Sequence, residues 1–186
     1  MKWEDSDDVI VIRCPNNRRQ ILHLLADMRE ERHPYLFITE NMIERELKTI
    51  LVPVSRLEED IYKAEICTYL ARKEACRCIL LCANDYGSMA ERNTQKIVSR
   101  FNSISQKIGR NLPYEVLKAQ KSSADIVRET TDRCTEWNAD MIILSASRDY
   151  GLDDIIFGPI ELYAIRNSPV PVMLINPRDD LFSLCD

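Results

Sequence analysis

The sequence predicts a doubly wound α/β fold with a parallel sheet of five strands, and three observations predict it. Between residues 48 and 177, short apolar runs alternate with longer segments whose apolar residues recur at helical spacing. The apolar runs are nearly continuous, which is typical of strands that are covered on both faces. A helical segment joins each strand to the next, and right-handed crossovers of this kind place helices on both faces of the sheet.

Two strand-helix units open the predicted domain. The run from Thr49 to Val54 is a short apolar strand, and Leu57 to Lys73 follows it at helical spacing. The run from Cys78 to Ala83 is a second buried strand. After a Tyr-Gly-Ser turn, a second helix is predicted to end at Gly109, because glycine readily adopts the left-handed conformation that stops a helix.

Two further units complete the domain. The run from Tyr114 to Ala119 alternates and predicts a less buried strand, and a helix follows from Ser122 to Trp137. The run from Met141 to Leu144 is a continuous apolar strand. A loop then leads to a helix that begins with Pro159 at its first position and ends near Asn167, and Val170 to Ile175 forms the last strand.

The first forty residues read as a strand, a helix and a strand that extend the sheet. Residues 8–12 parallel residues 140–144, Arg18 to Glu31 is helical, and residues 33–39 parallel residues 168–175. Any α/β protein can offer such a likeness by chance, but a matched proline before the second strand favours a true partial repeat. The predicted organisation is a partial repeat at 1–41, a linker at 42–47, the main domain at 48–177 and a tail at 178–186.

Length and composition describe an ordinary soluble globular protein. The chain has 186 residues, of which 45% are hydrophobic and 30% charged. Its net charge of -5 argues against a nucleic-acid partner or a membrane-surface face, both of which need clustered Lys and Arg. No apolar run approaches the ~20 residues that span a bilayer, and the first residues lack the apolar stretch of a signal peptide. We expect a cytoplasmic protein.

Catalytic and metal-binding patterns are lacking. Five of the seven cysteines lie in or beside apolar strand and helix patterns and are expected to be reduced core residues. These are Cys67, Cys76, Cys78, Cys82 and Cys134. The Cys76-x-Cys78 pair has no second pair, and both histidines lie near the start of the chain, so we expect no metal site. Without a nucleophile-base pattern or a phosphate-binding loop, we expect no enzyme.

The order of elements, with Ile50-Leu51-Val52-Pro53-Val54 at the start and Ala139 to Ile175 at the end, resembles the universal stress protein family. The resemblance covers about residues 48 to 176. Its most specific stretch is a strand, a loop, Gly158, a helix and Asn167-Ser168-Pro169-Val170-Pro171-Val172. In the family this stretch typically reads as a strand, Gly-x-x-Gly, nine residues, Gly-Ser or Gly-Thr, a helix and Pro-x-Pro-Val.

The resemblance implies an adenine nucleotide alpha hydrolase-like fold and, in many members, an ATP or AMP site at the carboxyl ends of the first and fourth strands. Sheet geometry favours the same place, because ligands of open α/β sheets lie where the strand order reverses. The candidate adenine-nucleotide positions in this chain are Pro53, Val54, Ser55, Ala83, Ser145, Arg148, Gly151, Gly158 and Pro159.

Several of these residues depart from the family pattern. Ser55 stands where an acidic residue commonly follows the first strand, and the first two motif glycines fall on Ser145 and Arg148. Their side chains narrow a cradle in which glycine lets backbone N–H groups approach phosphate. Gly158 is kept, but Pro159 replaces the following Ser or Thr and has no N–H to offer an anion.

Acidic residues surround the same place. Four carboxylates are expected near the phosphate position, and carboxylates at a helix start suit its dipole as a bound anion would. They belong to Asp149, Asp153, Asp154 and Glu161. The site is therefore predicted to be occupied by the chain's own charges, with no cofactor. The opposing interpretation is that Arg148 contacts phosphate directly, which leaves ATP or AMP as the alternative ligand.

The leading hypothesis is a nonenzymatic stress-response or regulatory protein that acts through protein-protein interaction. The alternatives are an ATP- or AMP-binding switch and a soluble regulatory partner of an ion transporter. In the family, the last strand commonly pairs with its copy in a partner subunit. Here Tyr35 to Thr39 is predicted to pair with it inside one chain and so to mimic that dimer, which leaves the outer edge of the Val9 to Ile12 strand open to homodimerisation. The predicted interface residues are Val172, Met173, Leu174, Ile175, Tyr35 and Phe37.

Overall fold

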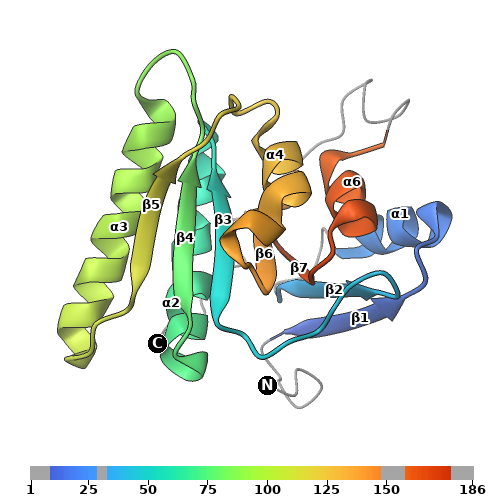
Figure 1. Ribbon diagram of the computed structural model, residues 1–186, viewed down its shortest axis with the longest axis horizontal. Coiled ribbons are helices and arrows are strands. Elements are labelled where there is room, and N and C mark those ends of the chain that lie inside the picture. Colours follow the sequence, from blue (N-terminus) through green and yellow to red (C-terminus); the bar gives the residue numbers. More distant parts are fainter. Residues whose placement is uncertain (1–8, 29–32, 148–157, 177–186) are drawn as a thin grey trace.

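The computed structural model describes residues 9–28, 33–147 and 158–176, and it shows a mostly parallel seven-stranded sheet in the order β1-β2-β7-β6-β3-β4-β5 (Figure 1). The predicted fold class is confirmed. Five strands form the predicted doubly wound sheet, and two strands from the start of the chain extend it. The strands are β1 (Ile10–Cys14), β2 (Tyr35–Thr39), β3 (Thr49–Val54), β4 (Arg77–Cys82), β5 (Tyr114–Lys118), β6 (Met141–Ser145) and β7 (Val172–Ile175).

Helices cover both faces of the sheet, as crossover connections require (Figure 1). One face carries α2 and α3, and the other carries α1, α4 and α6. The α-helices are α1 (Arg18–Asp27), α2 (Lys63–Glu74), α3 (Met89–Ile108), α4 (Ile126–Arg133) and α6 (Ile160–Asn167), and two 3-10 turns are η3 (Glu58–Tyr62) and η4 (Cys134–Trp137). None of the helices in the described segments is long and apolar enough to cross a membrane.

Two hydrophobic cores follow from the pleat of the strands. Ile50 and Val52 of β3 pack in the core that contains Phe101 of α3, whereas Leu51 packs in the core that contains Ile126 of α4. Both faces of β3, β4 and β6 are buried, which explains their continuous apolar sequences. Strand β5 lies at an edge and is only partly buried, as predicted.

The predicted helix end at Gly109 is correct, and the ends of other helices differ from prediction. Gly109 has φ 63 and ends α3. The helix predicted from Ser122 to Trp137 is α-helical from Ile126 to Arg133 and continues as the 3-10 turn η4.

The helix predicted from Leu57 begins instead as the 3-10 turn η3 and becomes α-helical at Lys63. Pro159 is the N-cap of α6 and not its first helical residue; its carbonyl accepts a hydrogen bond from the N–H of Leu162 at 3.0 Å.

Strand β2, from the first segment of the chain, pairs with the last strand of the domain, as predicted. Strand β2 runs antiparallel to β7, with Tyr35 opposite Leu174 and Phe37 opposite Val172. All five residues of β2 are buried, and β1 pairs parallel to β2 at the edge of the sheet. Helix α1 begins after Asn17, whose side chain caps it, and packs beside α6 (Figure 1). The descent of this segment from a second domain stays a prediction.

Candidate functional site

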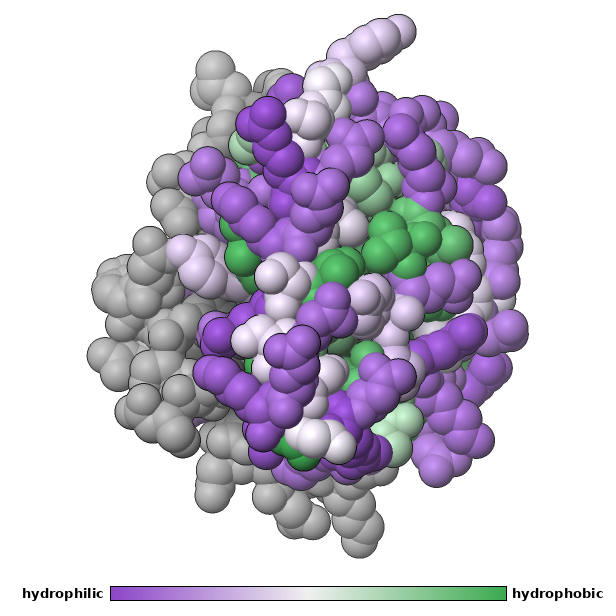
Figure 2. Space-filling model, turned by 90° about the vertical axis from the view of Figure 1, so that its left-hand side faces the viewer, coloured by the Kyte–Doolittle hydropathy of each residue, from purple (hydrophilic) through white to green (hydrophobic). Residues whose placement is uncertain are grey.

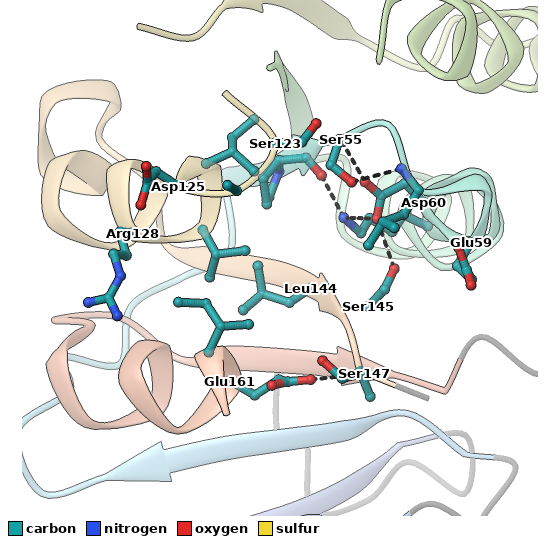
Figure 3. Close-up of a pocket in the computed structure, with 18 of the residues that line it drawn as sticks. Ser55, Glu59, Asp60, Ser123, Asp125, Arg128, Leu144, Ser145, Ser147 and Glu161 are labelled. Carbon is teal, nitrogen blue, oxygen red and sulfur yellow. Dashed lines mark hydrogen bonds and ion pairs between the residues drawn. The ribbon is translucent and has the colours of Figure 1, made fainter. Parts of the chain in front are cut away.

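A cavity of about 630 Å³ lies at the carboxyl ends of β3 and β6. These strands are neighbours in the sheet, but the chain continues from them in opposite directions across it, to β4 and to β7. This is the point where the strand order reverses and where open α/β sheets bind ligands. The loops after β3, β5 and β6 and the beginnings of α4 and α6 form the walls (Figure 3).

The structure brings four of the predicted site residues together in the cavity wall and places three others elsewhere. Pro53, Ser55, Ser145 and Gly158 line the cavity. Val54 and Ala83 do not line it, because both are fully buried in the two cores beneath the site. Val54 ends β3 and Ala83 follows β4, and their side chains pack in the cores because side chains of a strand alternate between its two faces.

Pro159 lines a smaller neighbouring pocket instead of the main cavity. Arg148 and Gly151 lie outside the described residues, as do Asp149, Asp153 and Asp154. The predicted role of Arg148 therefore stays a prediction.

A buried Asp60–Lys63 ion pair forms the floor beside β3 (Figure 3). The Asp60 carboxylate accepts hydrogen bonds from the Ser55 N–H at 2.5 Å, from the Lys63 ammonium at 2.6 Å and from the Ser145 hydroxyl at 3.1 Å. Lys63 also donates to the Pro53 carbonyl at 2.6 Å. Polar groups at the ends of β3 and β6 are thus bonded to one another and are not offered to a ligand.

Sequence reasoning missed this pair. Asp60 and Lys63 are 3% exposed, although both are residue types that are rarely buried. Their spacing of three residues in a helical segment allows contact, but the same spacing is common on solvated surfaces. A usable signal was that Ser55 stands where the family commonly has an acidic residue. The carboxylate that contacts Ser55 is that of Asp60, five residues later.

Glu161 is the second buried carboxylate of the site. It lies in the first turn of α6, is 1% exposed, and accepts a hydrogen bond from the backbone N–H of Ser147 through Oε1 (Figure 3). Its Oε2 atom has no hydrogen-bond partner among the residues that the structure describes. The carboxylate therefore joins the loop after β6 to the start of α6, where the helix dipole favours negative charge.

The rim opposite Glu161 is held together by Ser123. Its hydroxyl accepts from the Arg56 N–H at 2.8 Å and donates to Asp85, which also accepts from the Ser123 N–H at 2.8 Å. Partial burial opposes ionisation of Asp85, but the hydrogen bonds from Ser123 and the charge of Arg56 outweigh it and lower the pKa of Asp85. The loops after β3, β4 and β5 are thereby joined.

The charge of the cavity wall is negative. Among the residues that the structure describes, four carboxylates and two cations line it, and one of those cations, Lys63, is already paired with Asp60. The other, Arg128, projects from α4 (Figure 3) and stacks over the Tyr163 ring at 4.5 Å. The carboxylates are those of Glu59, Asp60, Asp125 and Glu161. An anionic ligand entering the cavity would meet an opposing field.

The buried thiols of the described residues lie in the hydrophobic cores. Cys67, Cys76, Cys78, Cys82 and Cys134 are buried and free, as predicted. Burial raises the pKa of Cys76 to about 12 and that of Cys134 to about 11, so both remain protonated at neutral pH. Within the described part of the chain, no group of three or more His, Cys, Asp or Glu side chains could hold a metal ion.

Comparison with solved structures shows the same fold in larger and smaller chains. A universal stress protein from Archaeoglobus fulgidus DSM 4304 matches with a TM-score of 0.61 and 16% identity over 93% of this chain and 62% of that one. A universal stress protein in complex with cAMP matches at 0.55 and 11%, over 72% of this chain and 100% of that one. A functionally unknown protein from Pseudomonas aeruginosa PAO1 matches at 0.55 and 14%, over 94% and 64%.

At these identities the structural likeness shows the fold alone, and this chain spans less than two thirds of the two longer structures. A search of curated proteins finds no match. The model of the universal stress protein family matches residues 46–176, which include every described residue that lines the cavity. That match covers more than half of the chain, and its range coincides with the doubly wound part of the sheet. The chain therefore belongs to the universal stress protein family.

Proposed function

We propose that this protein is a nonenzymatic regulator of the universal stress protein type, which acts by binding a protein partner and whose cavity does not hold a nucleoside triphosphate. The observation that carries this proposal is the position of Glu161. Its buried carboxylate accepts the Ser147 N–H at the start of α6. A backbone N–H at this place is the kind of donor that would otherwise bind a phosphate.

The energetic argument concerns charge and lost donors. Two unit charges 4 Å apart interact by about 4 kcal/mol at an effective dielectric constant of about 20. The repulsion between a phosphate and Glu161 at this distance is therefore about as large as the binding free energy of a ligand with a millimolar dissociation constant. Pro159 contributes no N–H, and the Ser55 N–H and Ser145 hydroxyl are bonded to Asp60. A triphosphate would have to displace these bonds and replace them.

The sheet edges support a role in partner binding. Strand β2 covers the edge of β7, so that edge is closed to a second copy, while β5 ends the sheet on the other side. Figure 2 shows this side, on which hydrophobic surface lies between hydrophilic side chains. Met89, Ile108 and Val116 of α3 and β5 are exposed here. An open edge strand beside apolar surface is a common site of strand addition.

A thermal-shift scan with ATP, AMP and adenosine, each with Mg²⁺, tests the proposal. A ligand at 100 times its dissociation constant should add about 2.7 kcal/mol of stability. We expect no shift at micromolar nucleotide. A clear shift with micromolar ATP would contradict the proposal.

A second candidate is a switch that responds to a nucleotide with less charge. The cavity volume of about 630 Å³ falls in the range of small-molecule sites, and one solved relative is in complex with cAMP. A cyclic monophosphate carries one negative charge and would meet less repulsion from Glu161 than ATP. Adding cAMP to the same scan separates the candidates, because a shift with cAMP and none with ATP supports the switch.

A further inference from the structure

A second, smaller pocket lies where the first segment of the chain meets the family domain. It has a volume of about 120 Å³ and lies beside the start of α6. Its wall includes Arg18 at the beginning of α1, Arg128 of α4 and Arg166 of α6. Arg18 precedes the segment that matches the family, so this pocket depends on the docking of α1.

Three guanidinium groups from three helices therefore face one small space in a chain whose net charge is -5. No carboxylate belongs to the described residues that line the pocket. Neither Arg18 nor Arg128 forms an ion pair with any carboxylate of the described segments. Arg166 donates through Nε to the Asn16 side chain at 3.0 Å, which accounts for only one of its donors. The pocket thus concentrates positive charge that the carboxylates of the described residues do not pair with.

Contacts with neighbouring residues hold the Arg128 and Arg166 side chains in place. The Arg128 guanidinium stacks over the Tyr163 ring at 4.5 Å, and the Tyr163 hydroxyl donates to Asp132 at 2.6 Å, which fixes the ring. Asn16 also donates to the Arg166 carbonyl at 3.1 Å, so the start of α1 is bonded to the end of α6. A guanidinium that is positioned before binding loses less conformational freedom when it contacts an anion.

Gly158 lies in the wall of the pocket, where a side chain would have little room. It has φ +87, and a Cβ atom there would lie 2.8 Å from Leu162 Cδ2 and 3.6 Å from Arg18 Nη2. The added atom would clash with Leu162, whereas its distance to Arg18 is an ordinary van der Waals contact, so glycine is needed here for its φ and for the packing of Leu162.

We propose that this pocket binds a phosphate-sized oxyanion, either inorganic phosphate or the phosphate group of a monoester. The volume of about 120 Å³ is well below the roughly 300 Å³ at which drug-sized ligands begin, so the pocket suits one phosphate group and not a nucleotide. Planar guanidinium groups match the geometry of phosphate oxygens and remain charged at every physiological pH. The bound anion bridges α1 to α4 and α6 and so couples the first segment to the family domain.

Isothermal titration with inorganic phosphate at low ionic strength tests the proposal on the full chain. We expect saturable binding in the millimolar range, weakened roughly tenfold or more in Arg18→Gln and again in Arg128→Gln, because each loses charge-assisted hydrogen bonds to the anion. Arg92→Gln is the matched control, since Arg92 is an exposed arginine of α3 remote from the pocket, and it should bind like the wild type. The absence of saturable heat, or equal weakening in Arg92→Gln, would overturn the proposal.

AMP and adenosine distinguish the source of the phosphate. If the pocket takes a monoester, AMP binds more tightly than inorganic phosphate, because the main cavity shares Arg128, Gly158 and Ile160 with it. If it takes the free ion, both bind alike. Adenosine should not compete with phosphate in either case. The proposal is contradicted if adenosine still binds to Arg18→Gln and Arg128→Gln while inorganic phosphate gives no binding heat.

Hydrogen exchange supplies a second measurement that does not depend on nucleotide binding to the main cavity. Phosphate should slow amide exchange in α1 of the wild type and leave it unchanged in Arg18→Gln. Unchanged exchange in the wild type at saturating phosphate would remove the proposed bridge between α1 and the family domain.

Discussion

At the scale of single residues, the site is governed by two buried carboxylates that are satisfied in different ways. Asp60 is neutralised by Lys63 and accepts two further hydrogen bonds. Glu161 relies on one backbone N–H and on the start of α6. Burial of a charge is expensive unless partners compensate for it, so the two residues should respond differently to substitution.

Replacing Lys63 by Met leaves the Asp60 carboxylate buried without its counter-charge. We expect the free energy of unfolding to fall by about 3–5 kcal/mol, as measured by urea denaturation. The double variant Asp60→Asn/Lys63→Met should recover part of the loss, because no buried charge remains. Lys48→Met, which removes an exposed partner of Glu46, is the control and should change little. A wild-type stability for Lys63→Met would contradict the structural role of the pair.

Asp85 should make stability depend on acid pH. Its pKa is lowered in the folded state, so its ionised form stabilises the protein above the unfolded pKa of about 3.9, and this contribution is lost as the pH falls towards the lowered folded value. The difference in unfolding free energy between wild type and Asp85→Asn should thus be largest near neutral pH and shrink below pH about 4. A difference that is independent of pH would show that Ser123 stabilises both forms equally.

The sequence predicted part of the site and could not predict the rest. Ser55, Ser145 and Gly158 were placed correctly because strand ends and a loop motif determine their positions. Arg128 was missed because its contact with Tyr163 joins elements far apart in sequence, and Asp60 was missed because only its burial and its bond to Ser145 distinguish it from a surface carboxylate. Such contacts leave no periodic pattern in a single sequence.

At the scale of secondary-structure elements, the beginnings of helices determine what the cavity can bind. Pro159, the N-cap of α6, has no N–H, and Glu161 in the first turn carries a carboxylate. The N-terminus of α6 therefore offers less to an anion than a helix start usually does. Helix α1 brings Arg18 to the same region from the other side. Of the three arginines of the smaller pocket, Arg128 also lines the main cavity, whereas Arg18 and Arg166 lie beside it.

Gly158 should be sensitive to substitution for two reasons. Alanine would be strained at φ +87 by roughly 1–2 kcal/mol, and its Cβ would also approach Leu162 Cδ2 at 2.8 Å. Gly109→Ala is the matched control, because Gly109 also has positive φ but nothing lies within 4 Å of the added atom. Thermal unfolding should show a larger loss for Gly158→Ala. Equal losses would mean that Leu162 moves aside at no cost.

Most elements were predictable because both cores require apolar residues at regular spacing. Strands β3, β4 and β6 were found as continuous apolar runs, which follows from their burial on both faces. The 3-10 turn η3 was not predicted, because its apolar spacing is that of a helix and its packing against α3 and β6 is made across the fold. The start of α6 was accurate to within a residue at Pro159, whereas α2 and α4 begin several residues after their predicted starts.

At the scale of the whole molecule, the first segment completes the sheet by covering the edge of β7. The antiparallel pairing of β2 with β7 was predicted from a likeness between the two ends of the chain, and the structure confirms the pairing. Val172, Met173 and Leu174 lie opposite β2 residues and are fully buried. The segment therefore occupies the place that the family resemblance assigns to a partner subunit.

Removing residues 1–41 should change the oligomeric state. The deletion exposes the unpaired edge of β7 and its apolar side chains, and we expect the shortened chain to dimerise or aggregate through that edge. Size-exclusion chromatography with light scattering measures the change against the full chain. A shortened chain that stays folded and monomeric at micromolar concentration would show that β2 does not protect β7.

The central claim is that the chain's own carboxylates take the place of nucleotide phosphates in the cavity, and titration of wild type and Glu161→Gln with Mg²⁺-ATP tests it most directly. The substitution removes the charge but keeps an oxygen that can accept the Ser147 N–H. Glu58→Gln, an exposed neighbour of the cavity, serves as the control. We expect no micromolar binding by wild type or Glu58→Gln and a measurable gain in Glu161→Gln. Micromolar binding of ATP by the wild type, unchanged in Glu161→Gln, would contradict the account.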